Sequence, residues 1–285
     1  MKKAHPAGKV WLITGCSRGF GRALAEAVIA SGARLIATAR DAHALDALVE
    51  LAPERVQALS MDVNDEAEVR AGVTRAVAAF GRVDVLVNNA GYGLIGAVEE
   101  VSDAEARAQM ETNVFGALKV TCALLPYLRE QGSGHILNIS SVAGVVSTPG
   151  LGLYNASKYA LEGWSEALAL ELAPLGIKLT LIEPGPFRTE WAGASLVQAA
   201  RTLEAYDATA GATLRTLKSY TGHQPGDPAK AAAAMIKVVE SKNPPLRLPL
   251  GEMALTRIRS KLKAQLAELD AWEKVALDTA FAAGK

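Results

Sequence analysis

The stretch VWLITGCSRGFGRALAEAV, residues 10–28, decides which fold the chain takes. Its apolar run at 10–14 predicts a strand, GCSRGFG at 15–21 predicts a tight turn, and the pattern after Gly21 predicts a helix. The turn fits two templates. As G-x-S-x-G around Ser17 it matches a nucleophile elbow, and as G-x-x-x-G-x-G it matches a phosphate cradle. Both templates need a strand before the turn and a helix after it, so the rest of the sequence must decide.

Apolar runs rich in Val, Ile and Leu recur along the chain and alternate with helical patterns, which is typical of a parallel sheet covered on both faces. Strands are predicted at 10–14, 34–39, 56–61, 83–88, 135–140, 178–183 and 246–250. Helices are predicted at 21–31, 42–51, 66–80, 103–130 and 154–173. We therefore predict an α/β fold with a Rossmann-type doubly wound parallel sheet of about seven strands, helices on both faces and a helical C-terminal extension.

The chain is expected to form a single domain over residues 1–285. Its parts are a cofactor and catalytic region at about 8–190, a substrate lid at about 187–226, and a closing helix, strand and long helix at about 227–285. Asp227 and Pro228 predict the start of the first closing helix. The long helix carries an apolar stripe, which predicts packing on its own domain, with a subunit contact as the alternative: Leu255, Ile258, Leu262, Leu266, Leu269, Trp272 and Ala276.

Composition excludes several kinds of partner. Lys+Arg and Asp+Glu both number 30, so no overall charge favours nucleic acid or an anionic membrane. No stretch approaches a membrane span, and the N-terminal apolar run is too short for a signal peptide. Cys16 and Cys122 show no metal-type spacing and are expected to be reduced and buried. We expect a cytoplasmic protein without a metal site.

The serine hydrolase template fails on its other requirements. Only sixteen residues precede Ser17, so no earlier strand–helix loop can supply an oxyanion donor. The histidines do not fall where a triad needs one: His43 lies at a charged helix start, His135 opens a strand, and His223 lies in an irregular stretch. The phosphate cradle is therefore the favoured reading, because the glycines allow a sharp turn and close approach of a pyrophosphate to the amides of the following helix.

Seven motifs in order and spacing resemble the short-chain dehydrogenase/reductase family over roughly residues 8–190. They are TGCSRGFG at 14–21, Asp62, NNAG at 88–91, Asn113, NISS at 138–141, YNASK at 154–158 and PGPFRT at 184–189. The resemblance implies that Tyr154 exchanges the substrate proton and that Lys158 lowers the pKa of Tyr154 and holds the nicotinamide ribose. It also implies that Ser141, rather than its neighbour Ser140, hydrogen-bonds the substrate oxygen, and that Asn113 supports a water chain to the lysine.

The residues alone agree with this assignment. Tyr154 and Lys158 are four residues apart on a predicted helix, so they share one face. Ser141 ends a predicted strand, where open parallel sheets bind ligands. A phenol has a pKa of about 10, and a neighbouring ammonium stabilises its phenolate, which produces a better acid and base near neutral pH.

The predicted cofactor is NADP(H). NAD sites usually carry an acidic residue at the end of the second strand, where this chain has Ala39 followed by Arg40. Arg40 and Arg18 are suited to clamping a 2′-phosphate, whereas Asp41 leaves NAD as the alternative. The predicted cofactor-binding residues are Gly15, Ser17, Arg18, Gly19, Phe20, Gly21, Arg40, Asp62, Val63, Asn89, Ala90, Gly91, Tyr154, Lys158, Pro184, Gly185 and Thr189.

The sequence thus predicts an NADP(H)-dependent oxidoreductase that transfers a hydride between the nicotinamide and a carbonyl or alcohol, with reduction as the expected direction. The alternative is a non-catalytic cofactor-binding scaffold or redox sensor on the same fold. The resemblance implies a homo-oligomer, either a dimer or a tetramer. An apolar substrate is expected, because a set of apolar residues follows the strand ends: Tyr92, Leu94, Val142, Leu151, Phe187 and Trp191.

Overall fold

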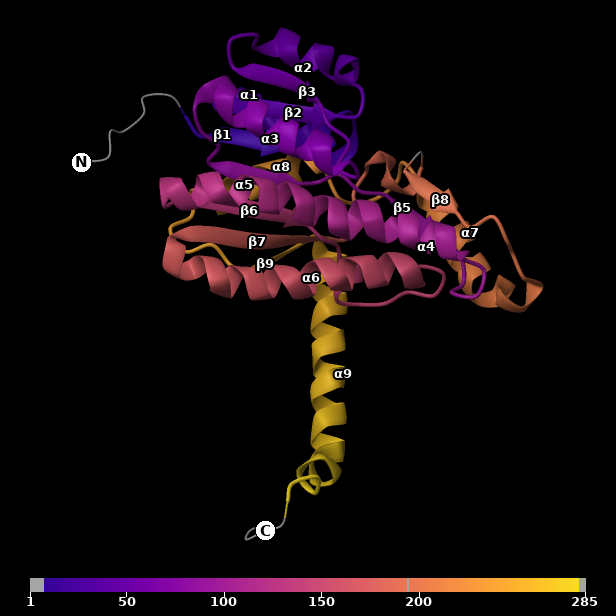
Figure 1. Cartoon of the computed structure of the whole chain (residues 1–285). Helices are drawn as coiled ribbons and strands as arrows, with labels where there is room; N and C mark the ends of the chain where they lie inside the picture. Colours follow the sequence, from indigo (N-terminus) through magenta and orange to yellow (C-terminus); the bar gives the residue numbers. More distant parts are fainter. Residues whose placement is uncertain (1–7, 194, 282–285) are drawn as a thin grey trace.

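The computed structural model describes residues 8–193 and 195–281, and its centre is a parallel sheet of seven strands (Figure 1). The strand order is β3-β2-β1-β4-β6-β7-β9, so the chain builds outward from β1 in one direction and then in the other. The bounds are β1 Val10–Ile13, β2 Arg34–Ala39, β3 Val56–Ser60, β4 Val85–Asn88, β6 Gly134–Ile139, β7 Ile177–Pro184 and β9 Arg247–Leu250. This arrangement confirms the predicted fold class, with strand ends within two residues of the predicted ones.

Helices cover both faces of the sheet, and the side chains of β1 show how the two cores form. Trp11 and Ile13 face α1 (Gly19–Ala30), α2 (Asp46–Leu51) and α8 (Pro228–Glu240), whereas Val10 and Leu12 face the opposite layer. That opposite layer contains α3 (Glu66–Phe80), α5 (Ala117–Gln131) and α6 (Gly152–Leu172). Successive strand residues point to opposite faces, so continuous apolar strands fill both cores.

Two predicted helices are divided in the structure. The range 42–51 contains a 3₁₀ turn, Ala42–Leu45, before α2. The range 103–130 contains α4 (Asp103–Met110), a π-helical turn at Glu111–Gly116, and α5. A π turn admits one extra residue, which hydrophobic periodicity does not reveal, and such turns are common at functional sites.

The lid region has more regular structure than the weak periodicity predicted. It contains β8 (Leu196–Gln198), which pairs in parallel with β5 (Gly93–Ile95), and the helix α7 (Ala212–Tyr220). The two strands have three residues each, which is too short for a periodic pattern, and two of the three β8 residues are exposed.

The last helix, α9 (Glu252–Leu277), leaves the body of the protein (Figure 1). Its first turns are held by Ala254 and Ile258, which pack beside Val142. Beyond them Leu262, Leu266, Leu269 and Trp272 are between 55% and 69% exposed. The prediction that the whole stripe packs on its own domain is therefore wrong, because the helix axis carries its second half away from the sheet.

Burial of the cysteines also differs in part from expectation. Cys16 is buried, but Cys122 is exposed because it lies on the outward side of α5, opposite the buried Val120, Leu124 and Leu128. Among the described residues, no helix combines the length and apolar character needed to cross a bilayer.

Candidate active site

A cavity of about 1160 Å³ lies at the carboxyl ends of the central strands. It brings together nearly all the residues that the sequence predicted for cofactor and catalysis. The lining includes Gly15, Ser17, Arg18, Gly19, Phe20, Arg40, Asp62, Val63, Asn89, Ala90, Gly91, Ser141, Tyr154, Lys158, Pro184, Gly185 and Thr189. Gly21 and Asn113 are not among the lining residues, but both contact residues next to the cavity: Gly21 packs under Gly15, and Asn113 hydrogen-bonds Ser157.

The glycine-rich turn has the geometry of a phosphate cradle. Gly15 and Gly19 have φ angles of 71° and 60°, which side-chain-bearing residues rarely adopt. At Gly21 an added Cβ would lie 2.2 Å from the Gly15 carbonyl oxygen and 2.5 Å from Asn89 Nδ2. Only glycine therefore fits where the helix passes this closely under the turn.

Thr14 fastens the loop after β4 to this turn, a role that the sequence did not predict. Its hydroxyl oxygen accepts from the amides of Asn89 and Ala90 at 3.0 Å, and Asn89 Nδ2 donates to the Thr14 and Gly15 carbonyls at 2.8 and 3.0 Å. The sequence does show a threonine directly after the apolar run VWLI, which is the one local sign of this role. The contacts join two segments about 75 residues apart into one wall of the cavity.

The N-terminus of α1 faces the cavity without a capping side chain. Arg18 occupies the cap position and makes no side-chain cap hydrogen bond, and the first turn has no acidic residue. The first amides of a helix lack intrahelical partners and attract anions. The turn therefore fits a pyrophosphate, which supports the cofactor assignment.

Tyr154 lies in the wall of the cavity between Ser141 and Trp191. Its ring centroid is 5.1 Å from that of Trp191. Burial raises the pKa of Tyr154 to about 12, whereas hydrogen bonds with Ser141 and Trp191 lower it. This differs from the expectation that Lys158 lowers the tyrosine pKa, because removal of the phenol from water outweighs the other influences in the protein by itself.

Lys158 is buried one helical turn from Tyr154. Its Nζ donates to the Ile139 carbonyl at 2.8 Å and lies 5.8 Å from the centre of the Tyr154 ring. Burial lowers the pKa of Lys158 to about 8, and the negative charge of Glu162 opposes this shift. An ammonium that titrates near neutral pH and sits beside a phenol is suited to proton transfer.

Asn113 supports the site from the π turn. Its Oδ1 accepts from the Tyr92 amide at 3.1 Å, while its Nδ2 donates to the Tyr92 carbonyl at 3.0 Å and to Ser157 Oγ at 3.1 Å. It therefore joins the loop after β4 to α6, the helix that carries Tyr154 and Lys158.

A charged cluster lies behind Lys158, and the sequence did not predict it. Arg247 Nε is 3.1 Å from Glu162 Oε2 and 3.6 Å from Glu183 Oε1, and its Nη2 is 2.8 Å from Glu166 Oε2. Burial and the nearby Glu162 raise the pKa of Glu183 to about 7. The members come from α6, β7 and β9, so no sequence spacing could have brought them together.

At the adenosine end of the predicted cofactor site, Arg18 and Arg40 are exposed and line the cavity together with Ala39 and Asp62. Asp41 is not among the lining residues. Its Oδ1 accepts from the His43 amide at 3.0 Å and caps the 3₁₀ turn. The side chain that left NAD as an alternative is thus engaged in local structure.

Apolar side chains also line the cavity. All six residues predicted to wall a substrate pocket are among its lining residues: Tyr92, Leu94, Val142, Leu151, Phe187 and Trp191. The lid helix α7 adds Leu217 and Tyr220. Phe187 also packs against Phe20, with ring centroids 5.1 Å apart, so it connects the lid to the glycine-rich turn.

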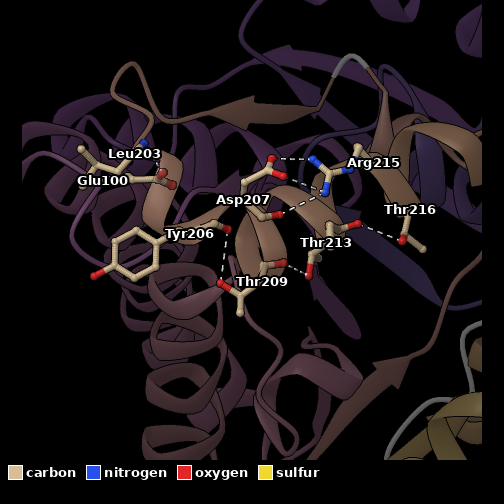
Figure 2. A network of polar contacts seen from close by, with 9 residues as sticks. Glu100, Leu203, Tyr206, Asp207, Thr209, Thr213, Arg215 and Thr216 are labelled. Atoms are coloured by element: carbon tan, nitrogen blue, oxygen red, sulfur yellow. Dashed lines mark hydrogen bonds and ion pairs between the residues drawn. The ribbon is translucent and has the colours of Figure 1, made fainter.

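Polar contacts order the predicted lid and hold it to the body (Figure 2). Within the segment, Arg215 Nη1 lies 2.6 Å from Asp207 Oδ1 at the start of α7. Glu100, which lies outside it, accepts through Oε1 from the Leu203 amide at 2.7 Å. Glu105 likewise accepts from the Ala200 amide at 2.9 Å. Glu100 before α4 and Glu105 in its first turn therefore fix the position of this segment, which contributes residues to the cavity lining.

The glycine-rich turn, the doubly wound sheet and the tyrosine–lysine pair at its edge define an oxidoreductase of the nicotinamide-dependent class. The chain belongs to the short-chain dehydrogenase/reductase family, since the family profile described as short chain dehydrogenase matches residues 9–199. This membership supports an oxidoreductase enzyme and leaves the non-catalytic scaffold without support.

Two curated relatives extend over most of the chain. An oxidoreductase named BOA17 from Botryotinia fuckeliana is 41% identical over 95% of this chain and 99% of its own length. A 3-ketodihydrosphingosine reductase from Bacteroides thetaiotaomicron is 38% identical over 86% of this chain and 88% of its own.

Solved structures agree with the fold. A short-chain dehydrogenase from Streptomyces avermitilis superposes with a TM-score of 0.91 at 45% identity, covering 97% of this chain and 100% of that one. A short-chain dehydrogenase/reductase from Burkholderia phymatum in complex with NAD has a TM-score of 0.79 at 29% identity, covering 91% and 95%. An alcohol dehydrogenase from Thermococcus sibiricus, complexed with 5-hydroxy-NADP, has a TM-score of 0.70 at 26% identity, covering 85% and 95%. Such neighbours bind either dinucleotide.

The contact between Gly21 and the turn predicts a strong effect of Gly21→Ala. The added methyl would lie 2.2 Å from a backbone oxygen, so the turn or α1 must shift, and the free energy of unfolding should fall by about 3 kcal/mol. Gly163→Ala is the control, since this exposed glycine of α6 has nothing within 4 Å of the added Cβ; it should gain about 0.5–1 kcal/mol. Urea unfolding measures both. Equal stability of Gly21→Ala and the unaltered protein would contradict the described turn.

Proposed function

We propose that this oxidoreductase transfers a hydride between NADP(H) and an apolar carbonyl or alcohol substrate, with Tyr154, Lys158, Ser141 and Asn113 as its functional tetrad. The observation that carries the proposal is the single cavity that contains the glycine-rich turn, the tyrosine–lysine pair and an apolar pocket. A cofactor and a small substrate can therefore meet beside Tyr154. Carbonyl reduction is the proposed direction, and the name of the Bacteroides relative, a reductase, agrees with it.

The cofactor assignment rests on the residues of the cavity. NADP(H), when bound, supplies or accepts the hydride. The amides of the glycine-rich turn would hold its pyrophosphate, and Asp62 and Val63 would contact its adenine. Asn89, Ala90 and Gly91 would line the ribose side. Arg18 and Arg40 would hold the 2′-phosphate, because guanidinium groups bind phosphate oxygens well.

The proton chemistry belongs to Tyr154. In reduction its hydroxyl donates a proton to the carbonyl oxygen, which Ser141 Oγ orients by a hydrogen bond. The phenolate that forms is buried, so it needs a nearby positive charge. Lys158 supplies that charge from the same face of α6, and the Ile139 carbonyl keeps its ammonium in place.

Asn113 is a positioning residue in this scheme. Its amide spans the loop after β4 and the Ser157 hydroxyl, so it sets the distance between the cofactor side of the cavity and α6. The water chain implied by the family resemblance remains a prediction. The same holds for the cytoplasmic location and for the homo-oligomeric state.

The tyrosine assignment predicts that Tyr154→Phe lowers turnover by 10²–10⁴, because the variant lacks only the proton donor. Loss of NADPH absorbance with a panel of aliphatic and aromatic aldehydes and ketones measures the rate. NADPH binding should persist in the variant. Tyr159→Phe is the matched control: this tyrosine of the same helix is 41% exposed and should leave turnover unchanged. Near-full activity of Tyr154→Phe would refute the assignment.

The arginine assignment predicts that an Ala39→Asp, Arg40→Ala double change lowers the preference for NADPH over NADH. Losing one charge-assisted contact to the 2′-phosphate should weaken NADPH by roughly ten- to a hundredfold, and the new carboxylate repels phosphate. NADH lacks that phosphate, so it should change far less. The ratio of kcat/KM for the two cofactors measures the effect, with Arg22→Ala as a control outside the cavity lining. An unchanged ratio, or an unaltered enzyme that prefers NADH, would mean that Asp41 reads the ribose.

A further inference from the structure

The second half of α9 presents an unpartnered apolar stripe to solvent. Residues 259–277 extend about 28 Å at 1.5 Å per residue, and every one of them is at least partly exposed. Leu262, Leu266, Leu269 and Trp272 follow one another at steps of three and four, the spacing by which two helices pack along a seam. Side chains of this size repeated along a free helix indicate a partner.

The charges of α9 are divided between its two halves. Arg259, Lys261 and Lys263 precede Leu266, whereas Glu268, Asp270 and Glu273 follow it, with Lys274 as an exception. In the part of the chain that the structure describes, none of these three basic and three acidic residues forms an ion pair. A helix that is basic and then acidic is complementary to itself when reversed, and it repels itself when parallel.

We propose that α9 is a dimerisation arm that pairs in antiparallel fashion with α9 of a second copy of this chain. With Leu266 opposite its counterpart, Arg259 lies opposite Glu273 of the second copy. Leu262 then lies opposite Asp270, one residue from Leu269 of the second copy. Lys263 then lies between Glu268 and Asp270 of the second copy. The contact is isologous, so one patch provides both sides and the assembly closes.

The same charges argue against a membrane as the occupant. A helix that lies on an anionic bilayer carries Lys and Arg along its polar face. Here the distal half carries Glu268, Asp270 and Glu273 beside the most exposed apolar residues. Such a surface would repel anionic headgroups, whereas a reversed copy of α9 neutralises it.

Site-specific cross-linking tests the pairing in the full-length chain. The background is Cys122→Ser, because Cys122 is the exposed cysteine and Cys16 is buried. Leu266→Cys in this background should give a covalent dimer with a short bismaleimide, because the position faces itself. Leu277→Cys also lies on the free part of α9, but it should give at least tenfold less covalent dimer. In an antiparallel pair the two copies of residue 277 lie at opposite ends of the paired helices.

Charge reversal tests the recognition itself. Arg259, Lys261 and Lys263 are all changed to Glu in one variant, and Glu268, Asp270 and Glu273 are all changed to Lys in a second, each carrying the reporter Leu266→Cys. Each variant alone should lose cross-linking at least tenfold, because both halves then carry one sign. An equimolar mixture should recover it as a heterodimer. Arg257 is left unchanged because it lines the cavity and contacts Thr148.

Three outcomes would overturn the proposal. Equal cross-linking at positions 266 and 277 would indicate parallel pairing. Absence of cross-linking at position 266 would refute the pairing. Binding of the unaltered protein to vesicles of anionic phospholipid would then indicate a membrane occupant. Charge-reversed variants that cross-link as well as the parent, or fail to recover on mixing, would show that these charges do not select the partner. None of these readouts depends on enzyme activity.

Discussion

The hydrogen bond from the Lys158 ammonium to the Ile139 carbonyl joins helix α6 to the carboxyl end of β6 in the interior of the protein. A buried ammonium is stable only where its donors have partners, so the ends of the strands and the face of α6 must stay in register. Asn138 reinforces this, since it donates to Ser165 of α6 at 2.7 Å and accepts from Asn88 of β4 at 2.8 Å. The geometry of the residues proposed for catalysis is thus a consequence of how α6 is fixed to the sheet.

The groups around Lys158 divide between those that face the cavity and those that lie behind it. Tyr154 and Ser141 face the cavity, while Glu162 and Arg247 form a charged cluster on the other side. Glu162 raises the lysine pKa against the effect of burial. The site therefore keeps an ammonium that can be either charged or neutral near physiological pH, which a lysine in solution cannot.

Most of the central sheet could be predicted from the sequence because its strands are short segments rich in Val, Ile and Leu, as VWLI of β1 and VLVN of β4 show. The glycine-rich turn and the tyrosine–lysine pair were also evident, since their chemistry depends on local spacing. Features that depend on contacts between distant parts of the chain could not be predicted. The π turn around Asn113, the β5–β8 pair, and the meeting of Arg247 with Glu162 and Glu183 depend on tertiary packing. The stripe on α9 was visible, but its sequence could not show that the body of the protein ends beneath Ile258.

In the proposed mechanism a buried, protonated Lys158 stabilises the Tyr154 phenolate during reduction, and the pH dependence of kcat/KM tests this most directly. Burial lowers the pKa of Lys158 to about 8, so the charged form predominates below that pH and is lost above it. Reduction consumes a proton and needs the ammonium, so kcat/KM should be constant below about pH 8 and fall tenfold per pH unit above it. In Lys158→Arg, whose guanidinium stays charged, the remaining activity should not show this fall. A kcat/KM that stays constant to pH 10 in the unaltered enzyme, or an identical fall in Lys158→Arg, would contradict the account.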